Sequence, residues 1–165
     1  MASQLKDSGI ALTILANMLN RANKFYSSNK ITDADNLYNL AFENLNILSN
    51  YRASLNESEH QAENLNLNQQ KIDQELFQVK YKLMMAIIRC RRRMNDLSYA
   101  EKLCDQLIDL TPNQYESYYQ RARVRRDLGK RDLALQDVAK AEVLSNNIND
   151  AQIKKLYESC YKVKT

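Results

Sequence analysis

The stretch that decides the fold is residues 115–146, YESYYQRARVRRDLGKRDLALQDVAKAEVLSN. It holds two helix-forming segments separated by Leu128-Gly129, a pair that suits the end of a helix followed by a tight turn. In the second segment, spacings of three and four residues place one set of side chains on a single helical face. That stripe consists of Ala134, Leu135, Val138, Ala141 and Glu142. The stretch therefore predicts a helical hairpin.

The same pattern occurs earlier in the chain. Ala100 lies 34 residues before Ala134 and opens a second stripe, which comprises Ala100, Leu103, Cys104, Leu107 and Ile108. The turn Asn95-Asp96 precedes this stripe, and Pro112 follows it at a position that suits the start of the next helix. A third copy lies over residues 15–42, where Ala34 is 66 residues before Ala100. Repetition of one helical hairpin predicts an all-α solenoid, because stacked hairpins bury faces that one hairpin leaves exposed.

We expect a single domain over residues 1–165. Its repeats cover about residues 10–50, 70–112 and 113–147, and a capping helix at about 149–163 covers the last of them. Residues 51–69 are rich in Asn, Gln, Glu and Ser, which predicts a polar insertion with a flexible connection. Met1 and the capping helix favour a complete small protein, and the repeat region of a larger scaffold is the alternative.

The hairpins resemble the tetratricopeptide repeat. The positions that carry the resemblance best are Tyr118, Ala122, Leu128-Gly129, Ala134, Asp137 and Ala141. The long insertion after the first hairpin makes the layout similar to the repeat domain of FKBP-type immunophilins and related co-chaperones. This resemblance implies a fold that binds other proteins.

The composition argues against several classes of function. The only histidine, His60, stands in the polar insertion, and the two glycines are too far apart for a phosphate loop. We therefore expect no enzyme, no cofactor and no metal site. Three cysteines, Cys90, Cys104 and Cys160, have no disulfide or metal-ligand spacing, which suits a reducing compartment. Cys104 and Cys160 lie on apolar helical positions, where we expect buried packing. The apolar run 10–16 is read as part of the first helix and not as a secretory signal, so the expected location is the cytoplasm or the nucleus.

The resemblance also implies which residues line a concave groove. The partner-binding residues expected there are Asn23, Tyr26, Lys82, Met85, Arg89, Arg92, Arg93, Tyr119, Arg123 and Arg126. Five of them are arginines, although the net charge of the chain is only +4. Guanidinium groups make planar, bidentate contacts with carboxylates, so the groove is expected to bind an acidic segment of a partner. The arginines could instead pair within the fold, Arg93 with Asp127 and Arg126 with Glu158.

Co-chaperones of this type hold the acidic tails of Hsp70 and Hsp90 with a clamp of Lys, Asn, Asn, Lys and Arg. The matching positions here are Leu19, Asn23, Ala86, Glu116 and Gln120, of which only Asn23 agrees. The standard clamp is therefore not expected.

The sequence favours an adaptor or co-chaperone-like module that binds an acidic or acidic-hydrophobic peptide. One alternative is a helical repeat protein that binds RNA or another nucleic acid, whose affinity would fall steeply with salt. The small net charge and the interruption of the basic surface by Glu116, Asp127 and Asp137 argue against it. A three-repeat secretion chaperone is a further alternative, against which the long insertion argues. No membrane partner is expected.

Overall fold

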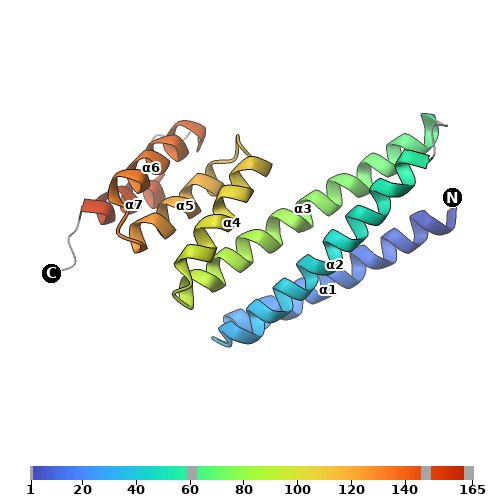
Figure 1. The fold of residues 1–165 in the computed structure, drawn as a ribbon, viewed down its shortest axis with the longest axis horizontal. Coiled ribbons are helices and arrows are strands. Elements are labelled where there is room, and N and C mark those ends of the chain that lie inside the picture. Colours follow the sequence, from blue (N-terminus) through green and yellow to red (C-terminus); the bar gives the residue numbers. More distant parts are fainter. Residues whose placement is uncertain (1, 59–62, 146–149, 162–165) are drawn as a thin grey trace. The chain divides into compact units, whose positions relative to one another are not determined.

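The computed structural model describes residues 2–58, 63–145 and 150–161, and within these ranges all regular structure is helical (Figure 1). The helices are α1 (Ala2–Ser27), α2 (Ile31–Ser58), α3 (Glu63–Arg93), α4 (Leu97–Leu110), α5 (Tyr115–Asp127), α6 (Arg131–Ser145) and α7 (Ala151–Tyr161). They form three consecutive helix pairs followed by α7, so the predicted all-α fold of three hairpins and a C-terminal helix is confirmed.

The chain divides into two compact units, residues 1–90 (unit 1) and 91–165 (unit 2), with the boundary inside α3. That the repeats form one continuous domain stays a prediction.

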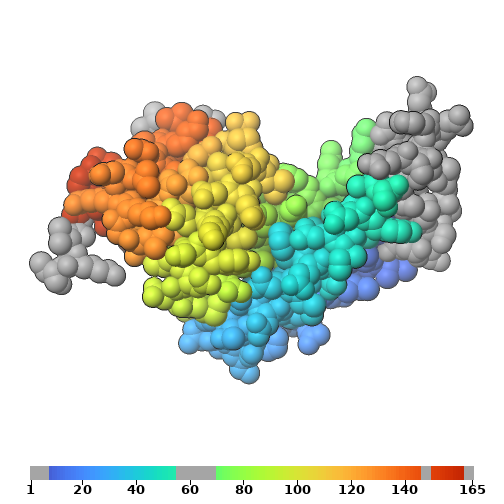
Figure 2. Space-filling view, in the orientation of Figure 1, coloured from blue at the N-terminus to red at the C-terminus, as the bar shows by residue number. Residues whose placement is uncertain are grey.

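Unit 1 is built on the α1–α2 hairpin and on α3. Small residues lie where the helices come closest: Ala22, Ala34 and Ala41 are all completely buried, and Leu15, Tyr38 and Leu45 fill the remaining space. The buried Arg52 of α2 donates through its Nε and NH2 groups to Asp73 of α3 and through NH1 to the Ser8 hydroxyl of α1, at 2.8–3.2 Å. One guanidinium thus joins all three helices. Much of the outer surface of α2 is in view in Figure 2.

Three turns share one backbone design. Asn29, Asn95 and Gly129 follow α1, α3 and α5, and each has a positive φ, of 60°, 62° and 77°. At every turn this residue donates its N–H to the carbonyl three residues back, and the next residue donates to the carbonyl five residues back. This is the Schellman motif, which satisfies carbonyls at a helix end and needs a residue that tolerates the left-handed region. Asn95 and Gly129 are 34 residues apart, so the turn repeats with the helices.

Unit 2 has its core between α5, α6 and α7. The buried cluster comprises Ala122, Ala134, Val138, Ala141, Ile153, Leu156 and Cys160. The last three belong to α7, which covers the apolar face of the final hairpin as expected of a capping helix. Asp150 begins this helix by accepting the backbone N–H groups of Gln152 and Ile153 at 2.9 and 3.3 Å. The stripe predicted on α6 was wrong at Glu142, which is exposed.

The polar stretch 51–69 differs most from expectation. The helix α2 continues to Ser58 and α3 begins at Glu63, so most of the predicted insertion is helical. No glycine or proline interrupts residues 51–69, and Glu, Gln, Leu and Ala are good helix formers. Residues 59–62, including His60, lie outside the described part of the chain.

All three cysteines are buried: Cys90 and Cys104 completely, while the exposed fraction of Cys160 is 6%. Burial raises the pKa of the Cys104 thiol to about 12 and also raises that of Cys160. Of the helices in the described ranges, none is long and apolar enough to cross a bilayer.

Candidate functional site

The ten expected groove residues divide between the two units. Asn23, Tyr26, Lys82, Met85 and Arg89 lie in unit 1, where we call them the unit 1 face. Arg92, Arg93, Tyr119, Arg123 and Arg126 lie in unit 2, where we call them the unit 2 face.

The centre of the unit 1 face is an arginine stacked on a tyrosine. The Arg89 guanidinium on α3 lies 5.8 Å from the centre of the Tyr26 ring on α1. Arg89 is exposed, and no carboxylate in the described part of the chain pairs with it. Such a cation–π contact holds a guanidinium by its face and leaves its N–H edge available.

The three other members of this face differ in how far they are available to a partner. Asn23 accepts a 2.6 Å hydrogen bond through Oδ1 from the hydroxyl of Tyr38, whose pKa burial raises to about 12. Asn23 is therefore partly used within the α1–α2 hairpin. Lys82 is exposed and Met85 is half-buried, so both can contribute to a surface contact.

The unit 2 face repeats the arginine–tyrosine pair on a single helix. The Arg123 guanidinium lies 5.6 Å from the centre of the Tyr119 ring, one turn earlier on α5. Its hydrogen bond within the described residues is a 3.4 Å contact from NH1 to Oε1 of Gln120. Burial, and then the neighbouring charges of Arg92 and Arg126, lower the pKa of Arg123. The charge of Asp127 acts in the opposite direction, but in the described residues no carboxylate forms an ion pair with Arg123 itself.

Arg92 and Arg126 are compensated, because they share Asp127. Arg92 donates through Nε to Asp127 Oδ2 at 2.7 Å, and Arg126 donates through Nε and NH2 to Oδ1 at 3.0 and 2.7 Å. Burial alone would raise the pKa of Asp127, but these hydrogen bonds lower it overall. The expectation that Arg126 pairs with Glu158 was wrong, since its NH1 donates to the Ser159 hydroxyl at 2.9 Å.

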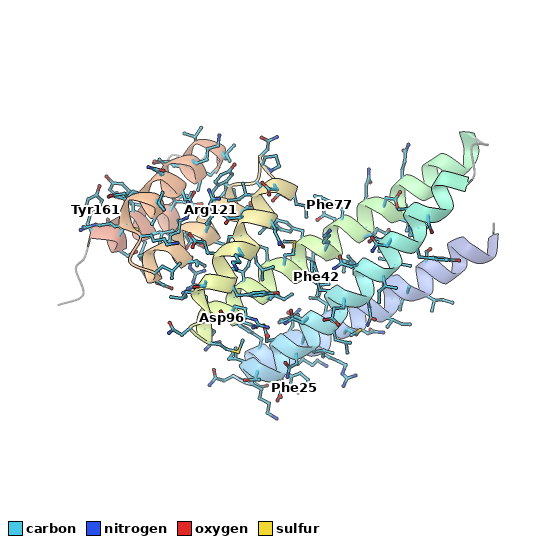
Figure 3. All side chains as sticks on the ribbon, viewed as in Figure 1. Phe25, Phe42, Phe77, Asp96, Arg121 and Tyr161 are labelled. Atoms are coloured by element: carbon cyan, nitrogen blue, oxygen red, sulfur yellow. The ribbon has the colours of Figure 1, made fainter. Side chains whose placement is uncertain are left out.

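The remaining arginines of α5 point elsewhere and hold the fold together. Arg121, which is labelled in Figure 3, binds Asp137 of α6 and Asp105 of α4. Arg125 binds Asp137 and Glu101 of α4, and all these contacts are 2.8–3.1 Å long. Helical geometry separates these positions from Arg123 and Arg126 by a large rotation about the helix axis. Only part of the arginine row is therefore available to a partner.

Several positions matched to the chaperone-tail clamp are occupied within the fold. Ala86 is buried, Gln120 is 7% exposed, and Asn23 is engaged with Tyr38. Glu116 adds a negative charge, and one of its oxygens is buried without a hydrogen-bond partner in the described residues.

Unit 1 also contains a cavity of about 540 Å³ that was not predicted from the sequence. Of its lining residues, only Lys82 was expected at a binding surface. The cavity lies between α1 and α3 and is lined by Leu12, Ala16, Lys71, Gln74, Glu75, Gln78, Val79 and Lys82. The binding residues expected on α3 begin at Lys82, so the earlier part of this helix carried none. The spacing of Lys71, Gln74, Gln78 and Lys82 on one helical face is the signal that could have found it.

No protein-family model matches the chain. Two solved structures are similar over nearly its whole length. The C-terminal tetratricopeptide-containing domain of a Plasmodium falciparum FK506-binding protein has a TM-score of 0.68 at 16% identity, and the match covers 93% of this chain and 89% of that one. The tetratricopeptide domain of Arabidopsis OM64 has a TM-score of 0.60 at 13% identity and covers 92% of this chain and 97% of that one. The chain therefore has the fold of a tetratricopeptide-repeat domain.

Proposed function

We propose that this chain is a non-catalytic interaction module that binds an acidic or acidic-hydrophobic segment of a partner protein through its unit 1 and unit 2 faces. The observation that carries the proposal is the arginine–tyrosine pair found in both units, Arg89 with Tyr26 and Arg123 with Tyr119. Neither arginine has a carboxylate partner in the described residues, while Arg52, Arg92, Arg121, Arg125 and Arg126 all have one.

A carboxylate from outside would meet each guanidinium at its N–H edge. The tyrosine ring limits the motion of the arginine, so less side-chain entropy is lost when the ion pair forms. Arg123 is half-buried beside other arginines, so a carboxylate there would both complete its hydrogen bonds and relieve repulsion. The tyrosines also supply the kind of contact area that dominates binding energy at many interfaces.

An adaptor or co-chaperone-like role in the cytoplasm or nucleus is the setting we propose for this activity. This role is supported by the fold and by the long polar stretch that follows the first hairpin in the sequence. The unmatched clamp positions argue for an acidic ligand other than the Hsp70 and Hsp90 tails.

The test is the double charge reversal Arg89→Glu with Arg123→Glu. Binding should be measured by affinity capture and by titration with acidic peptides taken from the captured partner. Each lost ion pair should weaken binding by at least about tenfold, which is about 1.4 kcal/mol. The melting temperature should fall by no more than about 3 °C, because neither arginine has an ion pair to lose among the described residues.

The matched control is Arg21→Glu with Lys140→Glu, which changes the net charge by the same amount at exposed positions outside both faces. The control should bind normally. Undiminished binding by the Arg89/Arg123 variant would refute the proposal, as would equal loss in the control. Retention of RNA at physiological salt, lost only in the double variant, would favour the nucleic-acid alternative instead.

A further inference from the structure

The cavity between α1 and α3 has an apolar wall and a charged rim. Leu12 and Ala16 of α1 and Val79 of α3 form the apolar part of its lining. Leu12 and Val79 are half-buried and Ala16 is exposed, so a ligand entering the cavity can cover apolar surface that is now in contact with water. A volume of about 540 Å³ is ample for one large side chain and its neighbouring backbone.

Two lysines mark the ends of the α3 part of this cavity. Lys71 and Lys82 are eleven residues apart, which places them on nearly the same face of the helix and about 16 Å apart along it. Both are exposed, and neither pairs with a carboxylate in the described residues. Between them lie the amides of Gln74 and Gln78 and the carboxylate of Glu75.

We propose that this cavity is a binding site for an extended peptide segment that carries one large apolar side chain between two acidic residues. The apolar side chain covers Leu12, Ala16 and Val79, and the two acids reach Lys71 and Lys82. The proposal rests on the function proposed above, since it specifies the chemistry of an acidic-hydrophobic ligand, but it uses a different set of residues from the two arginines.

The spacing of the charges fixes the form of the ligand. An extended chain advances about 3.3 Å per residue, so a 16 Å span corresponds to acids about five positions apart in the ligand, with about four residues between them. The amides of Gln74 and Gln78 can each donate and accept, which suits the backbone of an extended segment. Glu75 repels a carboxylate near the centre, so the acids belong at the ends of the segment and the apolar residue between them.

The chain contains no tryptophan, which supplies a direct probe. A six-residue peptide with Asp at both ends and a single Trp in the middle can be excited at wavelengths that the tyrosines absorb little. Titration with the full chain should shift the Trp emission to the blue as the indole leaves water. Two matched peptides serve as controls: one in which the Trp and one Asp exchange positions, and one in which Asn replaces both Asp residues. Each should bind at least about tenfold more weakly than the first peptide.

Three variants of the protein complete the test. Ala16→Phe fills the cavity from an exposed helical position, and Lys71→Glu with Lys82→Glu reverses the rim. Each should abolish the blue shift, while Lys102→Glu, at an exposed position on α4, should leave it unchanged. Circular dichroism on every variant establishes that the helices are intact.

The Arg89→Glu/Arg123→Glu variant separates this inference from the proposed function. It should retain the blue shift with the short peptide, because neither arginine lines the cavity. If Ala16→Phe binds the peptide as well as the wild type does, the cavity proposal is wrong whatever the arginines do. If the arginine variant keeps all acidic ligands while Ala16→Phe loses the probe, the proposed function fails and the cavity remains. Sedimentation that shows self-association, lost on filling the cavity, would replace the peptide by a second copy of this chain and overturn the proposal.

Discussion

At the scale of single residues, the three turns set up a sharp comparison between the two glycines. Gly129 has a φ of 77°, where an added Cβ is strained whatever the space around it. Gly9 lies inside α1, and a Cβ there would meet nothing within 4 Å. We expect Gly129→Ala to lower the free energy of unfolding by about 1 kcal/mol and Gly9→Ala to raise it by about 0.5–1 kcal/mol. Chemical denaturation followed by circular dichroism measures both.

The asparagine at the turn after α3, Asn95, extends this comparison. Asn95→Ala should destabilise the protein, and Asn95→Gly should not, because the positive φ of 62° is the constraint and not the amide. Equal losses from Asn95→Ala and Asn95→Gly would show that the asparagine side chain itself stabilises the turn.

At the scale of helices, α5 is tied to α4 and α6 by a shared carboxylate. Asp137 accepts from both Arg121 and Arg125, and its side chain is 5% exposed. Asp105 pairs with Arg121 alone among the residues that the structure describes, and its side chain is 50% exposed. We expect Asp137→Asn to cost about 3 kcal/mol, because it leaves two arginines short of a buried partner. Asp105→Asn should cost less than about 1 kcal/mol. Thermal unfolding of the two variants, which remove one charge each from the same network, decides whether burial sets the cost.

The helices themselves were largely predictable from the sequence, and their ends were less so. The apolar stripes at Ala100 and Ala134 identified α4 and α6, because burial on one face imposes a period that the sequence displays directly. The polar stretch 51–69 lacks that period, so its helical state depends on intrinsic propensity and on single contacts such as Arg52 with Asp73. A long-range pair of this kind leaves no local pattern to read.

The candidate site was predictable only in part. Repeat position identified Arg89 and Arg123 as surface residues, and the structure places each over a tyrosine. Repeat position did not reveal that Asp127 pairs with both Arg92 and Arg126. The sequence offered carboxylates on α5 and on α7 as partners for these arginines, and it did not decide between them. The cavity was missed because the resemblance placed expected groove residues only from Asn23 on α1 and from Lys82 on α3, whereas most of the cavity lining precedes them.

At the scale of the whole molecule, the buried thiols turn the chain into its own reporter of local opening. Cys90, Cys104 and Cys160 lie on three different helices, and none can meet an alkylating reagent until its helix moves away from its neighbours. Cys160 belongs to the short last helix, so it should be labelled first, and Cys104, the thiol with the pKa near 12, should lag well behind. Peptide-resolved mass spectrometry during labelling would give a separate alkylation rate for the cysteine of each helix. Earlier labelling of Cys104 than of Cys160 would contradict this order. A bound partner should lower the alkylation rate only of those cysteines whose helices it holds in place. The pattern of slowed cysteines would locate the interface without a single substitution.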